Sequence, residues 1–164
     1  MSLTTHRIVV SDTSCLILLS KINKLTLLKQ LYSEIYIPEA VYNEIVAKQD
    51  NASMLINTSN WIRVCKIIDR ERLNFFPDVL HLGEKEAMLL YEDIKADLII
   101  IDDNSARKEA TRRGQKVTGI LGVLSRAKEK GLINEVRPLI NELLNSGYFI
   151  SENVLDYLYQ SLAE

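Results

Sequence analysis

Residues 8–19, Ile8-Val9-Val10-Ser11-Asp12-Thr13-Ser14-Cys15-Leu16-Ile17-Leu18-Leu19, decide the fold. An apolar run ends at an acid and small hydroxyl residues, and a second apolar run follows. This pattern predicts a buried strand, a turn that carries Asp12, and a helix that begins near Ser14. Because open α/β sheets bind ligands at the carboxyl ends of their strands, Asp12 is a candidate site residue. The alternative is that Asp12 only caps the following helix.

Strands and helices are predicted to alternate along the rest of the chain. Further strands are expected at 35–37, 61–67, 98–101 and 116–118, and helices near 25–32, 39–46, 84–94, 105–113, 121–130, 138–144 and 151–162. Residues 69–80 are expected to form a loop. The four consecutive apolar residues 98–101 are typical of a strand covered on both faces. The alternation predicts an α/β fold, a three-layer α/β/α sandwich with a central, mostly parallel sheet.

Length and composition limit the kind of protein. Of 164 residues, 47% are hydrophobic and 26% are charged, which is ordinary for a globular domain. We expect a single domain over 1–164, with a core at about 7–131 and C-terminal helices at about 134–162 packed on it. No apolar run reaches the roughly 18 residues of a membrane span. Asp12 interrupts the first apolar run, which argues against a signal peptide, and two unpaired cysteines suit a cytoplasmic location.

The net charge of −2 hides an uneven distribution. Between residues 107 and 130, eight Lys or Arg stand against two Glu. Such a basic surface can attract a polyanion, although two solvated helix faces give the same pattern. The candidates for nucleic-acid binding are the first four of these cations, Arg107, Lys108, Arg112 and Arg113.

Acidic residues recur at special points of the predicted scaffold. Asp12 follows the first strand, Glu44 lies in the helix after the second strand, Glu84 begins a later helix, and Asp102 and Asp103 follow the most buried strand. Because these points share one edge of a parallel sheet, the acids can converge. Converging carboxylates raise one another's pKa unless a cation neutralises them, and oxygen ligands suit Mg²⁺ or Mn²⁺. The chemistry indicated is metal-assisted phosphodiester hydrolysis.

Structural alternatives exist for several acids. Glu84 could complement the dipole of its helix, and Glu44 could be an ordinary surface residue. The other acids of the Glu84 helix, Glu86, Glu92 and Asp93, are expected to face solvent.

Other catalytic chemistries fit the sequence poorly. The only histidines, His6 and His81, are expected to be surface or loop residues, so a nucleophilic triad lacks a base. A phosphatase would need Asp-x-Asp after the first strand, where this chain has Asp12-Thr13-Ser14. A phospho-accepting receiver domain would pair its acids after the first strand, whereas here the pair comes much later.

The chain resembles a PIN domain, particularly the prokaryotic branch of VapC-like and uncharacterised PIN-like proteins. The segments that carry the resemblance are 10–14, 37–45, 82–87, 100–107 and 116–124. They occur in the order of the family and span about residues 7–145. The resemblance implies a nuclease that acts on single strands, in most cases a ribonuclease, whose acids hold Mg²⁺ or Mn²⁺.

Site roles follow from the resemblance position by position. It implies that Asp12, Glu84 and the last acid are catalytic metal ligands and that Glu44 is a further catalytic acid. The family places the last acid two residues after a strand-end Thr, which favours Asp103. Ile101 stands in place of that Thr, so Asp102 and Asp103 both remain candidates. Ser14 matches a small hydroxyl residue that supports the first acid.

The leading functional hypothesis is a metal-dependent endoribonuclease, in its more specific form the toxin of a toxin–antitoxin pair. The resemblance implies three candidate partners, namely an RNA substrate, an antitoxin protein and a second copy of the chain in a homodimer. The alternative hypothesis is a PIN scaffold that binds RNA or protein without cleaving it. The intact set of acids argues against this alternative.

Overall fold

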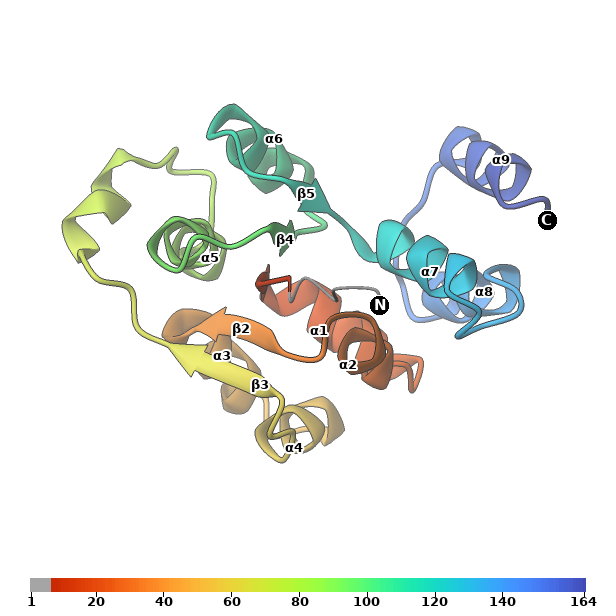
Figure 1. Ribbon diagram of the computed structural model, residues 1–164, viewed down its shortest axis with the longest axis horizontal. Helices are drawn as coiled ribbons and strands as arrows, with labels where there is room; N and C mark the ends of the chain where they lie inside the picture. Colours follow the sequence, from red (N-terminus) through yellow and green to blue (C-terminus); the bar gives the residue numbers. More distant parts are fainter. Residues whose placement is uncertain (1–6) are drawn as a thin grey trace, which may run out of the picture.

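The computed structural model describes residues 7–164, so His6 lies outside the described residues. Within this range, five strands form one parallel sheet in the order β3-β2-β1-β4-β5 (Figure 1). The strands are β1 (Val9–Ser11), β2 (Ile35–Pro38), β3 (Ile62–Cys65), β4 (Leu98–Ile100) and β5 (Val117–Thr118). The predicted parallel α/β architecture is therefore confirmed.

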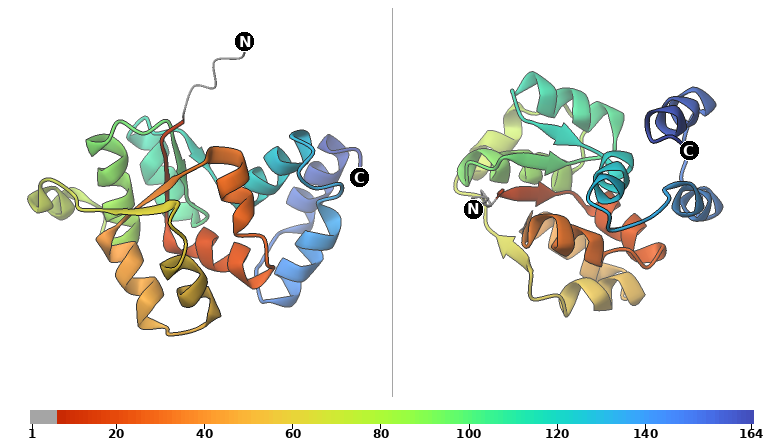
Figure 2. Two further views of the ribbon diagram at one scale, coloured as in Figure 1. Left: turned by 60° about the horizontal axis from the view of Figure 1, so that its bottom comes forward. Right: turned by 45° about the vertical axis from the view of Figure 1, so that its right-hand side comes forward.

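Helices cover both faces of this sheet (Figures 1 and 2). They are α1 (Thr13–Lys21), α2 (Thr26–Tyr32), α3 (Glu39–Ala47), α4 (Asn51–Asn57), α5 (Leu82–Asp93), α6 (Asn104–Arg112), α7 (Ile120–Glu129), α8 (Arg137–Asn145) and α9 (Glu152–Ser161). A 3₁₀ helix, η1 (Arg70–Phe75), occupies part of the segment that was predicted to be a loop. None of the helices within residues 7–164 is long and apolar enough to cross a membrane.

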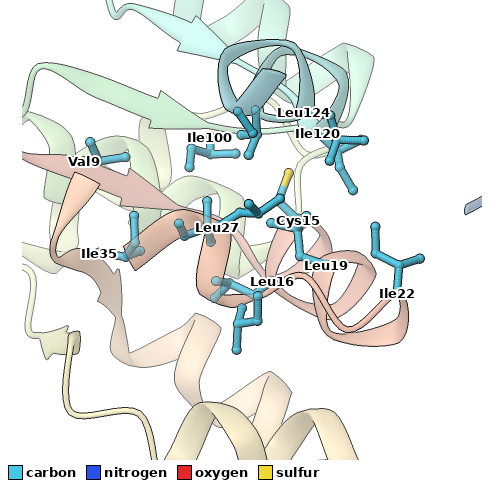
Figure 3. Packing of buried hydrophobic residues seen from close by; sticks show 14 of the residues in the cluster. Val9, Cys15, Leu16, Leu19, Ile22, Leu27, Ile35, Ile100, Ile120 and Leu124 are labelled. Carbon is cyan, nitrogen blue, oxygen red and sulfur yellow. The ribbon is translucent and has the colours of Figure 1, made fainter. Parts of the chain in front are cut away.

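Alternation along the central strands divides the hydrophobic core into two clusters. Val9 and Ile100 point into a cluster with α1, α2 and α7, whereas Val10 and Ile99 point into a cluster with α5 and α6. Successive side chains of a strand face opposite sides of the sheet, so strands covered on both faces must be apolar throughout. In the first cluster, Cys15 of α1 packs between the sheet and α7 (Figure 3). These two clusters produce the predicted three layers.

The C-terminal helices extend the first cluster. Leu139 and Leu143 of α8 and Leu158 of α9 belong to the same set of buried residues as α1 and α7. Figure 1 shows α8 alongside α7, with α9 beyond it. The expectation that these helices pack on the core therefore agrees with the structure.

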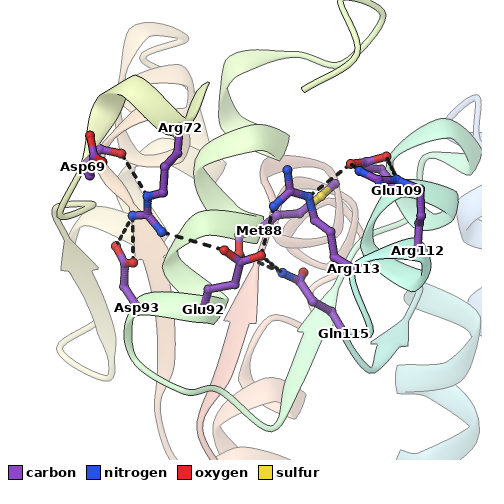
Figure 4. Close-up of polar contacts among 9 residues, drawn as sticks. All are labelled: Asp69, Arg72, Met88, Glu92, Asp93, Glu109, Arg112, Arg113 and Gln115. Atoms are coloured by element: carbon purple, nitrogen blue, oxygen red, sulfur yellow. Dashed lines mark hydrogen bonds and ion pairs between the residues drawn. The ribbon is translucent and has the colours of Figure 1, made fainter. Parts of the chain in front are cut away.

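Two acids of α5 are buried, which corrects the prediction that they face solvent. Glu86 is only 2% exposed, and Arg70 of η1 lies 3.7 Å from its carboxylate. The side chain of Asp93 is also buried and pairs with Arg72 of η1 at 2.7 Å (Figure 4). Glu92, the third acid, remains partly exposed. Arg70 and Arg72 of η1 supply cationic partners to these two carboxylates.

The order of the strands creates a switch point beside β1. After β1 the chain adds β2 and β3 on one side of the sheet, and it later adds β4 and β5 on the other. β1 and β4 are in register from Val9 opposite Leu98 to Ser11 opposite Ile100. Open α/β sheets bind ligands at such a point, outside the carboxyl ends of the strands. The residues that follow Ser11 and Ile100 therefore occupy the expected place for a site.

Candidate acidic site

Asp12 occupies the end of the central strand and begins α1. Its backbone amide donates to the carbonyl of Ile100 at 3.0 Å, and its Oδ1 accepts from the amide of Cys15 at 3.3 Å. Burial leaves Asp12 2% exposed and, together with the charges of Glu84 and Asp102, raises its pKa to about 7. Asp12 does cap the helix, as the structural alternative proposed. A cap alone requires no burial beside other carboxylates, so the alternative does not account for the whole arrangement.

Glu84 and Glu44 come from the helices on the same side of the site. Glu84 lies in the first turn of α5, where its Oε2 accepts from the amide of His81 at 3.0 Å. Burial raises the pKa of Glu84, and the negative charges of Asp103 and Glu44 raise it further. Glu44 of α3 accepts a hydrogen bond of 2.7 Å from the hydroxyl of Thr13. Three acids from three elements thus converge, as predicted from their positions at one sheet edge.

A cavity of about 410 Å³ opens where these acids meet. Its lining consists of Asp12, Thr13, Ser14, Glu44, His81, Leu82 and Glu84. Thr13 and His81 were not predicted to be site residues. Their positions in the sequence could have indicated them. Thr13 directly follows Asp12, and His81 comes three residues before Glu84, which is the spacing of a capping box.

The two candidates for the last acid act on different members of this group. Asp102 lies beside Asp12, whose pKa it raises, and its Oδ1 accepts from the amide of Ile120 at 3.1 Å. Asp103 caps α6 through a hydrogen bond of 2.9 Å from Ala106, and its charge acts on Glu84. Both residues contribute negative charge to the site, so both remain candidate ligands.

The donor chemistry of the site fits a hard divalent cation. Asp12, Glu84 and either Asp102 or Asp103 supply only oxygen, and a cation would oppose the elevation of the pKa of Asp12 and Glu84 that burial and the neighbouring carboxylates cause. In the conformation described for residues 7–164, no three acidic, His or Cys side chains are spaced to coordinate one ion. Coordination by this set therefore requires side-chain rotation or bridging water, which Mg²⁺ commonly retains.

The four predicted nucleic-acid-binding cations lie in different environments. Arg107 lies beside the acids and donates from Nη1 to the carbonyl of Ile101 at 3.3 Å. Lys108 is exposed. Arg112 and Arg113 instead pair with Glu109 of their own helix (Figure 4).

Arg113 is held by further contacts away from the acidic site. Its Nη1 lies 3.0 Å from Glu92 of α5, and its guanidinium lies over the ring of Phe76 at 3.8 Å from the centroid. Arg107 is therefore better placed than Arg112 and Arg113 to meet a ligand at the sheet edge, and Lys108 is free to meet solvent.

A parallel sheet with several carboxylates at its switch point places the protein among α/β proteins with an acidic site at the carboxyl ends of the strands. The family model described as a PIN domain matches residues 8–164, and the chain belongs to the PIN-domain family. No curated protein matches the chain. PIN domains are in general metal-dependent nucleases that use divalent ions, so the family gives this chain a nuclease-type fold. The match includes α8 and α9.

Proposed function

We propose that the protein is a metal-dependent endoribonuclease that hydrolyses phosphodiester bonds of single-stranded RNA with Mg²⁺ or Mn²⁺. The observation that carries this proposal is the buried carboxylate of Asp12, placed at the switch point with Glu84 and Asp102 close enough to raise its pKa. Buried like charges are costly without a counter-ion. A site that keeps them together is therefore suited to binding a cation.

The residues of the site have distinct tasks in this proposal. Asp12, Glu84 and either Asp102 or Asp103 would hold the ion, which when bound activates water and neutralises phosphate charge. The hydroxyl of Thr13 orients Glu44 across the cavity. Arg107, beside the acids, offers a guanidinium to a phosphate of the strand.

The proposal extends to partners and location through the VapC-like resemblance. Many toxin-type relatives of that branch pair with an antitoxin protein and form homodimers, and the branch resemblance implies a cytoplasmic location. We propose the same setting for this chain, with an antitoxin and a second copy as its protein partners.

The experiment is cleavage of a pool of single-stranded and structured RNA with Mn²⁺ or Mg²⁺, beside an EDTA control. Asp12→Asn is the test variant, because Asn keeps the helix cap while removing the charge. Asp50→Asn is its matched control, since Asp50 caps α4 through Ser53 at 2.9 Å and does not line the acidic cavity. We expect cleavage to require metal, to fall about 100-fold or more in Asp12→Asn, and to persist in Asp50→Asn.

Two outcomes would contradict this proposal. Cleavage that survives both EDTA and Asp12→Asn would place the activity elsewhere or in a contaminant. RNA binding by the wild-type protein without cleavage in either metal would replace the nuclease with the binding scaffold.

A further inference from the structure

A second cavity adjoins the acidic site and shares Asp102 with it. Its volume is about 520 Å³, within the range of ligand pockets. It lies between the α6–β5–α7 region and the segment that joins α8 to α9. The residues of its lining that combine charge and aromatic surface are Asp102, Arg107, Tyr148 and Phe149.

The segment between α8 and α9 presents one aromatic ring to solvent. Tyr148 and Ile150 are partly buried against the first hydrophobic cluster. Phe149, between them, is 85% exposed and lines the cavity. Anchoring on both sides fixes the backbone at Phe149, so its ring is held out at low conformational cost. An exposed, anchored ring beside a cavity is a surface on which a flat apolar ligand can stack.

On the inner wall of the cavity, the segment between α8 and α9 lies close to the acids. Tyr148 and Asp102 both line the cavity, and burial together with the nearby Asp102 carboxylate raises the pKa of Tyr148 above its usual value. A Cβ at Gly119 would overlap Nη1 of Arg107 and lie 2.8 Å from Oδ1 of Asp102. The absence of a side chain at Gly119 therefore lets Arg107 and Asp102 approach the same wall.

Arg107 supplies positive charge to this wall. It forms no ion pair with a carboxylate among residues 7–164, unlike Arg112 and Arg113. Its guanidinium has five N–H donors, and the contact with the Ile101 carbonyl uses one of its nitrogens. The remaining donors suit a phosphate.

We propose that this second cavity binds a nucleotide next to the scissile phosphate of the RNA strand, with Phe149 stacking on its base and Arg107 contacting its phosphate. This inference rests on the proposed ribonuclease function and deepens it. Single-stranded RNA is bound by stacking of unpaired bases on aromatic rings together with contacts to the backbone. Phe149 is then a substrate-binding residue of the RNA strand.

Binding of a short single-stranded RNA that contains 2-aminopurine tests the inference without requiring cleavage. The full chain is titrated in EDTA, so that the strand stays intact, and the fluorescence of the stacked base falls on binding. Phe149→Ala is expected to raise Kd roughly 5- to 100-fold and to remove the quenching. Phe149→Tyr keeps a ring and is expected to retain both. Arg107→Ala is expected to weaken binding and reduce its salt dependence.

Phe75→Ala is the matched control, because Phe75 in η1 is 79% exposed and does not line the cavity. Wild-type binding and quenching in Phe149→Ala, or equal losses in Phe149→Ala and Phe75→Ala, would overturn the inference. The two proposals can fail separately. RNA cleavage that is unaffected by Phe149→Ala would leave the nuclease standing without this subsite. The expected binding pattern without any cleavage would leave the subsite standing without the nuclease.

Discussion

Gly83 of α5 lies against Glu44 of α3, so that a Cβ at position 83 would overlap Oε1 of Glu44 and lie 3.2 Å from its carboxyl carbon. The two helices that carry Glu44 and Glu84 therefore meet through a residue without a side chain. This close approach, together with the hydrogen bond from Thr13, fixes where the Glu44 carboxylate lies in the cavity.

Gly83→Ala is predicted to lower cleavage while leaving the fold intact. Ala is about 1 kcal/mol better than Gly in a helix, and the atom displaced is the end of a flexible side chain, so thermal stability should stay close to that of the wild type. The Glu44 carboxylate must shift, which disturbs its hydrogen bond with Thr13, and misplacement of about 1 Å in an active site can cost about 100-fold in rate. The cleavage rate is measured beside Glu44→Gln. Full activity in Gly83→Ala together with a loss in Glu44→Gln would show that the position of Glu44 is not critical.

Asp12→Asn is predicted to stabilise the metal-free protein at neutral pH. The pKa of Asp12 is about 7 in the folded chain and 3.8 ordinarily, so between these values the folded state binds more protons than the unfolded state. The free energy of unfolding of the wild-type protein therefore falls as pH rises from about 4 to about 7. The Asn variant lacks this loss. Urea unfolding in EDTA at pH 4, 6 and 8 should show the variant gaining on the wild type by about 1.4 kcal/mol per pH unit, up to pH 7. A difference that does not change with pH would contradict the assigned environment.

Sequence patterns were sufficient for the sheet and for the convergence of acids, because both depend on local order along the chain. A strand such as 98–101, apolar at every position, must be covered on both faces, and the residues after parallel strands must share an edge. Asp12 and Glu84 were placed at one edge of the sheet in this way. Their placement required no knowledge of side-chain contacts.

Features that depend on contacts between distant segments were not predictable. The pattern of the helix that carries Glu86 does not indicate that this residue is buried, and its partner Arg70 comes from a 3₁₀ segment without regular periodicity. Arg113 is similar, since its basic character indicated nucleic-acid binding while its partners Glu92 and Phe76 come from elsewhere in the chain. The exposure of Phe149 was not predictable either, because its neighbours in the sequence form no motif.

Arg113→Ala is predicted to lower stability without changing RNA affinity, and Lys108→Ala to lower RNA affinity without changing stability. The Arg113 side chain is 16% exposed between Glu92 and Glu109, and its removal leaves both carboxylates without this partner. We expect a loss of about 2–4 kcal/mol in the free energy of unfolding, with little change in RNA affinity. Lys108 is exposed, so its loss should weaken RNA binding and leave stability within about 0.5 kcal/mol. Denaturant unfolding and RNA titration are measured on both variants. Weaker RNA binding by a fully stable Arg113→Ala protein would show that Arg113 does contact RNA.

Glu164→Gln is predicted to loosen the C-terminal helices without affecting the acidic site. The Glu164 carboxylate accepts from Lys128 Nζ at 2.7 Å and from the amides of Val136 and Arg137, so it joins α7 to the start of α8. Burial raises its pKa, but these donors outweigh burial and lower the pKa to about 2. Its stabilising effect is therefore complete above about pH 4.5 and disappears as pH falls through about 2.

The variant should lose roughly 1.5–3 kcal/mol of unfolding free energy at pH 7, with the difference from the wild type shrinking progressively in acid. Glu142→Gln, an exposed position on α8, is the matched control and should be neutral. Hydrogen exchange of the α8 amides together with denaturant unfolding measures the effect. Equal stability of Glu164→Gln and Glu142→Gln at pH 7 would mean that the Glu164 carboxylate contributes nothing to the packing of α8 on the core. The apolar contacts that α8 makes through Leu139 and Leu143 would then be sufficient.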